Sequence, residues 1–318
     1  HGVPRWGTVD ELLAVDEIEI VVNLTIPAVH AEIGLRAVAA GKHVWSEKPL
    51  ALDRGQADEL LAAARAAGVL IGCAPDTVLG AGIQTALRAI RRGDIGEPLT
   101  ATTVFQLPGP DVWHPSPEFL FARGAGPLFD VGPYYLTTLV HVFGPARRVS
   151  AESSTSRVTR TIGSGPRAGA TFPVEVPTHH AALIGFDAGQ SAQSVFSFQN
   201  ARTRMGIVEI SGTEGTLVLP DPNLFDGSSQ LWTAGRAEPV TLDAVGSTFG
   251  RGTGVADLAR AVRTGSAVRA SGAVASHVLD VLLAVSTAAE IGETVEVTST
   301  VDRPELTDEG WDPSAATL

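Results

Sequence analysis

The chain has 318 residues, of which 44% are hydrophobic and 18% charged, enough apolar material for two globular domains. Its 35 acidic and 23 basic residues give a net charge of -12, and no run of about 18 apolar residues occurs, so neither a nucleic-acid partner nor a membrane-spanning helix is expected. The single cysteine excludes an intrachain disulfide and a cysteine-rich zinc site, and it favours a cytoplasmic location.

Residues 1–76 alternate between helical and strand patterns. Thr8 is a helix-capping residue, and β-branched or apolar runs separate helical segments that end at glycines. The predicted strands are 18–24, 43–46 and 69–74, and the predicted helices begin at Val9, Pro27 and Asp53. This order predicts a parallel, doubly wound Rossmann-type sheet that is incomplete at its start.

Residues 77–318 show mostly strand-like alternation and form a second predicted domain. The expected strands are 98–107, 146–158, 179–186, 191–198, 206–211 and 215–219, and the expected helices are 81–92, 133–143, 254–264 and 273–290. The Gly-rich stretch 163–169 is predicted to be a loop or hairpin turn. The pattern indicates an α/β domain with a largely antiparallel open sheet flanked by helices.

The tripeptide Glu47-Lys48-Pro49 follows a short predicted strand. Proline ends the strand, and the carboxyl edge of a parallel sheet is where α/β enzymes present functional side chains. We therefore expect Lys48 near a cleft, beside a carboxylate. A surface ion pair at a strand end is the alternative.

A second motif, Gly124 to Tyr135, holds both tyrosines of the chain. If a helix begins near Asp130, then Asp130 and Tyr134 lie on one face, where a carboxylate and a phenol can orient a hydroxyl group and transfer a proton. A nearby Lys48 would lower the pKa of the phenol. Alternatively, Asp130 caps the helix and the tyrosines pack in the core.

Trp113 and His114 lie in a proline-rich loop before this motif. Tryptophan can stack on a pyranose ring, and histidine can bond a hydroxyl group; a loop anchored by a buried tryptophan is the alternative. His179 and His180 are adjacent in a strand and point to opposite faces, and no other spacing suggests a metal site.

Taken together, these motifs resemble the Gfo/Idh/MocA family of pyridine-nucleotide-dependent oxidoreductases. The similar segments are EKP at 47–49, GAGPLFDVGPYY at 124–135, GTEGTL at 212–217 and RASGAVASHVLDVLLA at 269–284. The resemblance implies a Rossmann domain followed by an α/β domain, NAD or NADP as cofactor, and a homo-oligomer formed through the C-terminal sheet.

The resemblance also implies roles for single residues. Lys48, Asp130 and Tyr134 would be catalytic, with Tyr134 in the place where many members carry histidine, and Trp113, His114, Asp130 and Tyr134 would bind substrate. The implied cofactor-binding residues are Thr25, Pro27, His30, Glu47, Lys48 and Pro49, although His30 could equally be a core histidine at a helix end.

The glycine-rich fingerprint G-x-G-x-x-G expected in the first strand–turn–helix unit is absent. We expect that a unit of ~30 residues or more is missing, either because the sequence is a fragment or because it is a remnant without cofactor binding. The chain alone is then expected to be oligomeric or poorly soluble, with an exposed strand edge near Ile20 to Val22 and a nucleotide Kd above about 1 mM.

Three functions remain open. The first is an NAD(P)-dependent oxidoreductase acting on a CH–OH group of a sugar, cyclitol or related polyol or diol. The second is carbonyl chemistry in which Lys48 forms a Schiff base. The third is a non-catalytic sugar sensor that lacks the nucleotide site.

Overall fold

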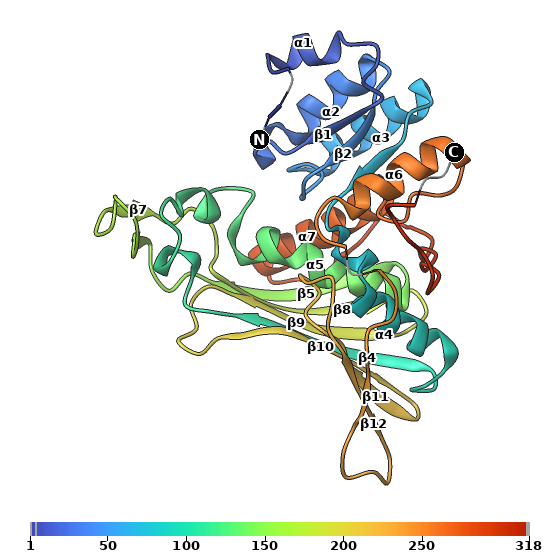
Figure 1. Cartoon of the computed structure of the whole chain (residues 1–318). Helices are drawn as coiled ribbons and strands as arrows, with labels where there is room; N and C mark the ends of the chain where they lie inside the picture. The colour runs from blue at the N-terminus through green and yellow to red at the C-terminus, as the bar shows by residue number, and fades with distance from the viewer. Residues whose placement is uncertain (1, 4, 248, 316–318) are drawn as a thin grey trace.

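The computed structural model describes residues 2–3, 5–247 and 249–315, and a small parallel sheet begins the fold (Figure 1). The strand order is β1-β2-β3. The elements are α1 (Val9–Leu13), β1 (Ile20–Asn23), a 3₁₀ turn (Pro27–Val29), α2 (His30–Ala39), β2 (His43–Ser46), α3 (Arg54–Ala67) and β3 (Ile71–Cys73). Side chains of Thr8 and Asp53 cap α1 and α3, as predicted. The predicted parallel sheet of Rossmann type is thereby confirmed.

A nine-stranded sheet dominates the rest of the molecule, in the order β13-β12-β11-β10-β4-β9-β8-β5-β14. Its strands are β4 (Pro98–Gln106), β5 (Ala146–Ser154), β8 (His179–Phe186), β9 (Ser191–Ser197), β10 (Arg204–Gly212), β11 (Gly215–Val218), β12 (Ser229–Thr233), β13 (Val240–Leu242) and β14 (Val295–Glu296). β4 and β9 pair in parallel, whereas the pairs on either side of them are antiparallel. The largely antiparallel sheet is confirmed.

The sequence analysis did not predict the short strands. β6 (Thr159–Thr161) and β7 (Thr171–Pro173) form a separate hairpin, and the glycine-rich stretch makes its turn, as one of the two predicted possibilities. Strands β6, β7, β12, β13 and β14 have only two to five residues each, too few for an alternating pattern to stand out.

Helices α5 (Gly126–Phe143) and α7 (Gly272–Ile291) lie between the two sheets and pack on one face of the larger one (Figure 1). The sequence placed the start of α5 at Asp130 or Pro133, and this is wrong. The helix starts with Gly126 and Pro127 in its first turn, where proline is well tolerated, and continues through Pro133. Asp130 is therefore inside the helix and does not cap it.

Contrary to the sequence-based expectation, α7 is long and apolar enough to cross a membrane by length and composition alone. In this fold it packs against α3, α5 and β5. Its buried polar residues are also paired inside the protein: His277 bonds the amide of Ala146, and Asp280 accepts from the amide of Ser299. These contacts are typical of a core helix.

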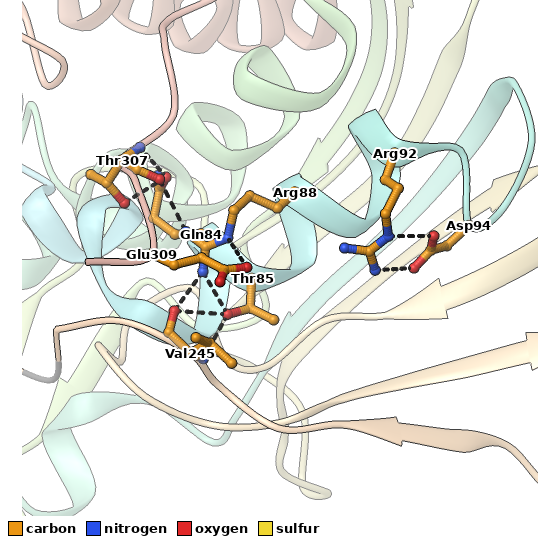
Figure 2. Close-up of polar contacts among 8 residues, drawn as sticks. All are labelled: Gln84, Thr85, Arg88, Arg92, Asp94, Val245, Thr307 and Glu309. Carbon is orange, nitrogen blue, oxygen red and sulfur yellow. Dashed lines mark hydrogen bonds and ion pairs between the residues drawn. The ribbon is translucent and has the colours of Figure 1, made fainter. Parts of the chain in front are cut away.

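Helix α4 (Ala81–Arg92) anchors two later segments of the chain (Figure 2). The Gln84 side chain accepts a hydrogen bond of 2.7 Å from the amide of Thr307. Arg88 donates to the carbonyl oxygens of Thr307 and Val245, at 3.1 and 2.5 Å. The amide of Val245 in turn donates to Thr85 Oγ1. The segment that leads to α6 (Thr253–Thr264) is thus fixed to α4.

Candidate active site

The tripeptide Glu47-Lys48-Pro49 lies at the carboxyl end of β2, between its neighbours in the parallel sheet. The amide of Glu47 donates to Asn23 O at the end of β1, and Ala74 N after β3 donates to Ser46 O. These bonds hold the turn against both neighbouring strands, and the Lys48–Pro49 peptide bond is cis. The turn therefore projects Lys48 from the sheet edge that α/β enzymes use for ligands.

Lys48 is held by a residue from the other domain. Its Nζ donates to Asp130 Oδ1 at 2.8 Å and to the main-chain oxygen of Asp130 at 2.5 Å, across 82 residues of sequence. The Lys48 side chain is only 14% exposed. This long-range, part-buried pair does not fit the alternative of a surface ion pair formed locally at a strand end.

The charge on Lys48 is favoured in this setting. Burial opposes the ammonium form, but attraction by anionic neighbours, the Asp130 carboxylate first among them, outweighs burial and raises the pKa of Lys48. Lys48 thus stays protonated throughout the ordinary pH range, as an ammonium group beside the first turns of α5.

Tyr134 lies one turn after Asp130 on α5, with Lys48 Nζ 5.4 Å from the centre of its ring. Burial raises the pKa of the phenol, and the nearby Lys48 and Arg251 lower it only in part. The expected lowering by Lys48 is present, but burial exceeds it, so the predicted net direction was wrong. At neutral pH Tyr134 is protonated. The neighbouring Tyr135 is fully buried, and its hydroxyl accepts from Gly206 N at 2.9 Å.

His30 joins the turns after β1 and β2. The buried ring places Nδ1 2.7 Å from Pro49 O and Nε2 2.9 Å from Thr25 O. The Thr25 hydroxyl donates to Asn23 Oδ1, and Pro27 begins the following 3₁₀ turn. The structure therefore brings all the proposed cofactor-binding residues to one sheet edge, with His30 beneath the surface as a connection between two turns.

Trp113 and His114 lie in the loop that joins β4 to α5. Trp113 is 63% exposed, so the alternative of a buried anchoring tryptophan is wrong. The two rings pack edge to face on each other, and His114 also packs on Phe119. Ser164 of the β6–β7 turn donates to Trp113 O. Within the described part of the chain, none of these contacts joins Trp113 or His114 to Lys48, Asp130 or Tyr134.

The sequence analysis missed Arg251 and Asp76. The Arg251 guanidinium lies 5.5 Å from the ring centre of Tyr134 and 3.6 Å from Asp76 Oδ1. A lone arginine in a Gly-rich segment about 117 residues after Tyr134 carries no recognisable motif, so only the folded chain reveals the pairing. Among the described residues no cluster of metal-binding side chains occurs.

Two family models match this chain. The oxidoreductase-family model of the NAD-binding Rossmann fold matches residues 1–74, and the Gfo/Idh/MocA C-terminal domain matches residues 83–218. The fold defines an α/β protein of the Rossmann type, whose ligands bind at the carboxyl edge of the parallel sheet. The chain belongs to the Gfo/Idh/MocA family of oxidoreductases.

Similar proteins include a 1,5-anhydro-D-fructose reductase from Ensifer adhaerens, 30% identical over 69% of this chain and 62% of that protein. A trans-1,2-dihydrobenzene-1,2-diol dehydrogenase from Bos taurus is 26% identical over 70% of this chain and 61% of its own length. The match therefore spans less than two thirds of these relatives. The crystal structure of an NAD binding oxidoreductase from Klebsiella pneumoniae superimposes with a TM-score of 0.78, at 27% identity, over 92% of this chain and 84% of the other.

Proposed function

We propose that this protein is an NAD(P)-dependent oxidoreductase that interconverts a CH–OH group and a carbonyl group on a sugar, cyclitol or related polyol or diol. The observation that carries the proposal is the cluster of Lys48, Asp130 and Tyr134 at the carboxyl edge of the parallel sheet. The sugar reductase and the diol dehydrogenase among the similar proteins support the substrate class.

The sheet edge suits a nicotinamide nucleotide, which when bound supplies or accepts the hydride. Leu24 and Ile26, just after β1, are 68% and 64% exposed and offer apolar surface to a flat ring. The residues proposed to hold the nucleotide are Thr25, Pro27, His30, Glu47, Lys48 and Pro49. Of these, His30 acts by fixing the two turns, because its ring nitrogens are already engaged.

Tyr134 is the proposed proton donor and acceptor. In carbonyl reduction the phenol gives its proton to the carbonyl oxygen as the alcohol forms, and in oxidation the proton returns. The Lys48 ammonium stabilises negative charge on the reacting oxygen, and Asp130 keeps the ammonium in place. Since the phenol is protonated at neutral pH, reduction is favoured there, and oxidation accelerates as the pH rises towards the raised pKa of Tyr134.

The Schiff-base alternative has less support. An amine attacks a carbonyl group only in its neutral form. The pairing of Lys48 with Asp130 favours the ammonium instead, and the pKa of Lys48 is raised. Trp113 and His114 remain candidates for a contact with a larger sugar, because the indole is exposed.

The test is a screen of the purified protein with NADH and NADPH over keto sugars, and with the oxidised cofactors over pyranoses, inositols and dihydrodiols, following reduced-nicotinamide absorbance. We expect turnover, and about a 10²–10⁴-fold loss of kcat in Tyr134→Phe. Tyr135→Phe is the matched control, because that hydroxyl bonds Gly206 inside the core. Sugar binding by calorimetry without turnover would favour the sensor instead.

A further inference from the structure

Arg251 is placed over Tyr134 by a dedicated set of contacts. Its Nη2 donates to Asn223 Oδ1 at 2.7 Å, and its Nη1 lies 3.6 Å from Asp76 Oδ1. The guanidinium carbon is 5.5 Å from the ring centre of Tyr134 and 5.5 Å from that of Phe225. Thus one guanidinium nitrogen bonds Asn223, another pairs with Asp76, and the guanidinium carbon lies near the rings of Tyr134 and Phe225.

The partner Asp76 is itself rigidly held. It is 3% exposed, in the 3₁₀ turn Asp76–Leu79 that follows β3. Its Oδ2 accepts the amides of Gly252 and Gly254, at 3.0 and 3.2 Å. One buried carboxylate therefore binds the backbone that follows Arg251 and also pairs with its guanidinium, whose side chain is 52% exposed. If Arg251 moved away, the carboxylate would lose its only cationic partner among the described residues.

The two chain segments that carry these contacts are both attached to the first turn of α4. Gly82 N donates to Phe225 O, and Ala81 N donates to Ser247 O. A Cβ atom at Gly82 would lie 2.8 Å from Asp226 O, so glycine is needed for this close approach. With the Thr85 and Arg88 contacts of Figure 2, α4 sets the position of the whole Arg251 segment.

The charges around Tyr134 come from three elements. Glu47 and Lys48 face it from the end of β2, Asp130 from the preceding turn of α5, and Arg251 from the segment before α6. Lys48 is already paired with Asp130. Arg251 is thus a second cation beside the phenol, and the attraction of a cation for an aromatic ring increases when the ring carries negative charge.

We propose that Arg251 is a positioning residue for Tyr134: held by Asp76 and Asn223, its guanidinium orients the phenol ring and stabilises the phenolate that forms when Tyr134 gives its proton to substrate. This inference rests on the proposed role of Tyr134 in the reaction. It adds a residue from the C-terminal domain that acts through the tyrosine.

The experiment is an absorbance titration of the phenol in the purified protein without cofactor or substrate. The sequence has only two tyrosines, and burial raises the pKa of Tyr135 far above its usual value. The change in phenol absorbance with pH therefore reports the ionisation of Tyr134. Tyr134→Phe supplies the blank. Arg251→Met and Arg251→Gln should lower the phenolate-to-phenol ratio at the wild-type midpoint by about threefold or more. Arg251→Lys should restore most of it. Arg236→Met, an exposed arginine on the β12–β13 hairpin, should leave it unchanged.

Wild-type midpoints in both neutral variants would overturn the inference. If the chain unfolds before Tyr134 ionises, the pH profile of carbonyl reduction tests the role of Arg251 instead. The alkaline limb of that profile should move to higher pH in Arg251→Met. It should stay in place if Arg251 is merely structural. The two proposals fail separately. A shifted titration with full activity in Tyr134→Phe contradicts the catalytic role, whereas an unshifted titration with an inactive Tyr134→Phe contradicts only the role of Arg251.

Discussion

His141 is a buried residue of α5 that takes no part in the site. Both ring nitrogens are buried and have no hydrogen-bond partner among the described residues. Burial, followed by repulsion from Arg91, lowers the pKa of His141 from 6.5 to about 3. The folded protein therefore keeps this ring neutral, whereas the unfolded chain binds a proton below pH 6.5. Stability is lost progressively as the pH falls from about 6.5 towards 3.

We predict that His141→Leu raises the free energy of unfolding. At pH 7 the gain is about 1–3 kcal/mol, because two unpaired polar atoms leave the core. At pH 5 the gain is roughly 2 kcal/mol larger, because the proton uptake of the unfolded state is removed. Urea unfolding at both pH values measures this. His277→Leu, the matched control, should destabilise the protein, because the ring bonds Ala146 and Ser299. An equal gain at both pH values would contradict the argument.

At the scale of elements, β2 connects the two halves of the protein. Its Val44 packs into the core between the parallel sheet and α2 and α3, whereas Trp45 points to the opposite face and into the larger core. The indole fits between Gly72 of β3 and Gly254 of α6: a Cβ atom at Gly72 would lie 2.6 Å from the ring, and one at Gly254 would overlap it. These two glycines let α6 cover the sheet just before Lys48.

Gly254→Ala should therefore destabilise the protein by about 1–3 kcal/mol or more, because a buried ring must be displaced. Denaturant unfolding followed by tryptophan fluorescence measures the loss. Gly250→Ala, four residues earlier, is the control, because apart from its two chain neighbours no described residue lies within 4 Å of a Cβ atom placed there and its φ is not in the left-handed region. The close-packing argument fails if the two variants unfold at the same denaturant concentration.

At the scale of the whole molecule, the larger sheet presents one face that α5 and α7 do not cover (Figure 1). On β8 the buried residues alternate with Ala181 and the 53% exposed Leu183, which pair with Val195 and Gln193 of β9. Flat sheet faces that mix small apolar and polar side chains suit association. We expect this face to be the interface of the homo-oligomer that the sequence suggested.

Leu183→Asp should convert that oligomer to a monomer, because a pair of carboxylates would be buried at a symmetric interface. Size-exclusion chromatography with light scattering gives the molar mass. Val158→Asp adds the same charge at a 76% exposed position before β6, outside the larger sheet, and should leave the mass unchanged. A monomeric wild-type protein, or an unchanged mass in Leu183→Asp, would rule out this interface.

Local sequence patterns determined most of the architecture. Capping residues, terminal glycines and β-branched runs placed α3, α4 and the three parallel strands, because each of these signals acts within a few residues. The same patterns brought Glu47-Lys48-Pro49 to a strand end. They misplaced the start of α5, because a proline in its middle was taken for a helix start, although neighbouring packing tolerates it.

Tertiary structure alone decided the contacts and the proton affinities of the candidate site. The spacing of Asp130 and Tyr134 was visible in the sequence. The hydrogen bond from Lys48 to Asp130, however, joins residues 82 positions apart, and the contact of Arg251 with the Tyr134 ring joins residues 117 positions apart. The sequence also suggested that a cation would lower the pKa of Tyr134, whereas burial raises it overall. Burial is a property of the assembled domains, and no pattern within a segment reports it.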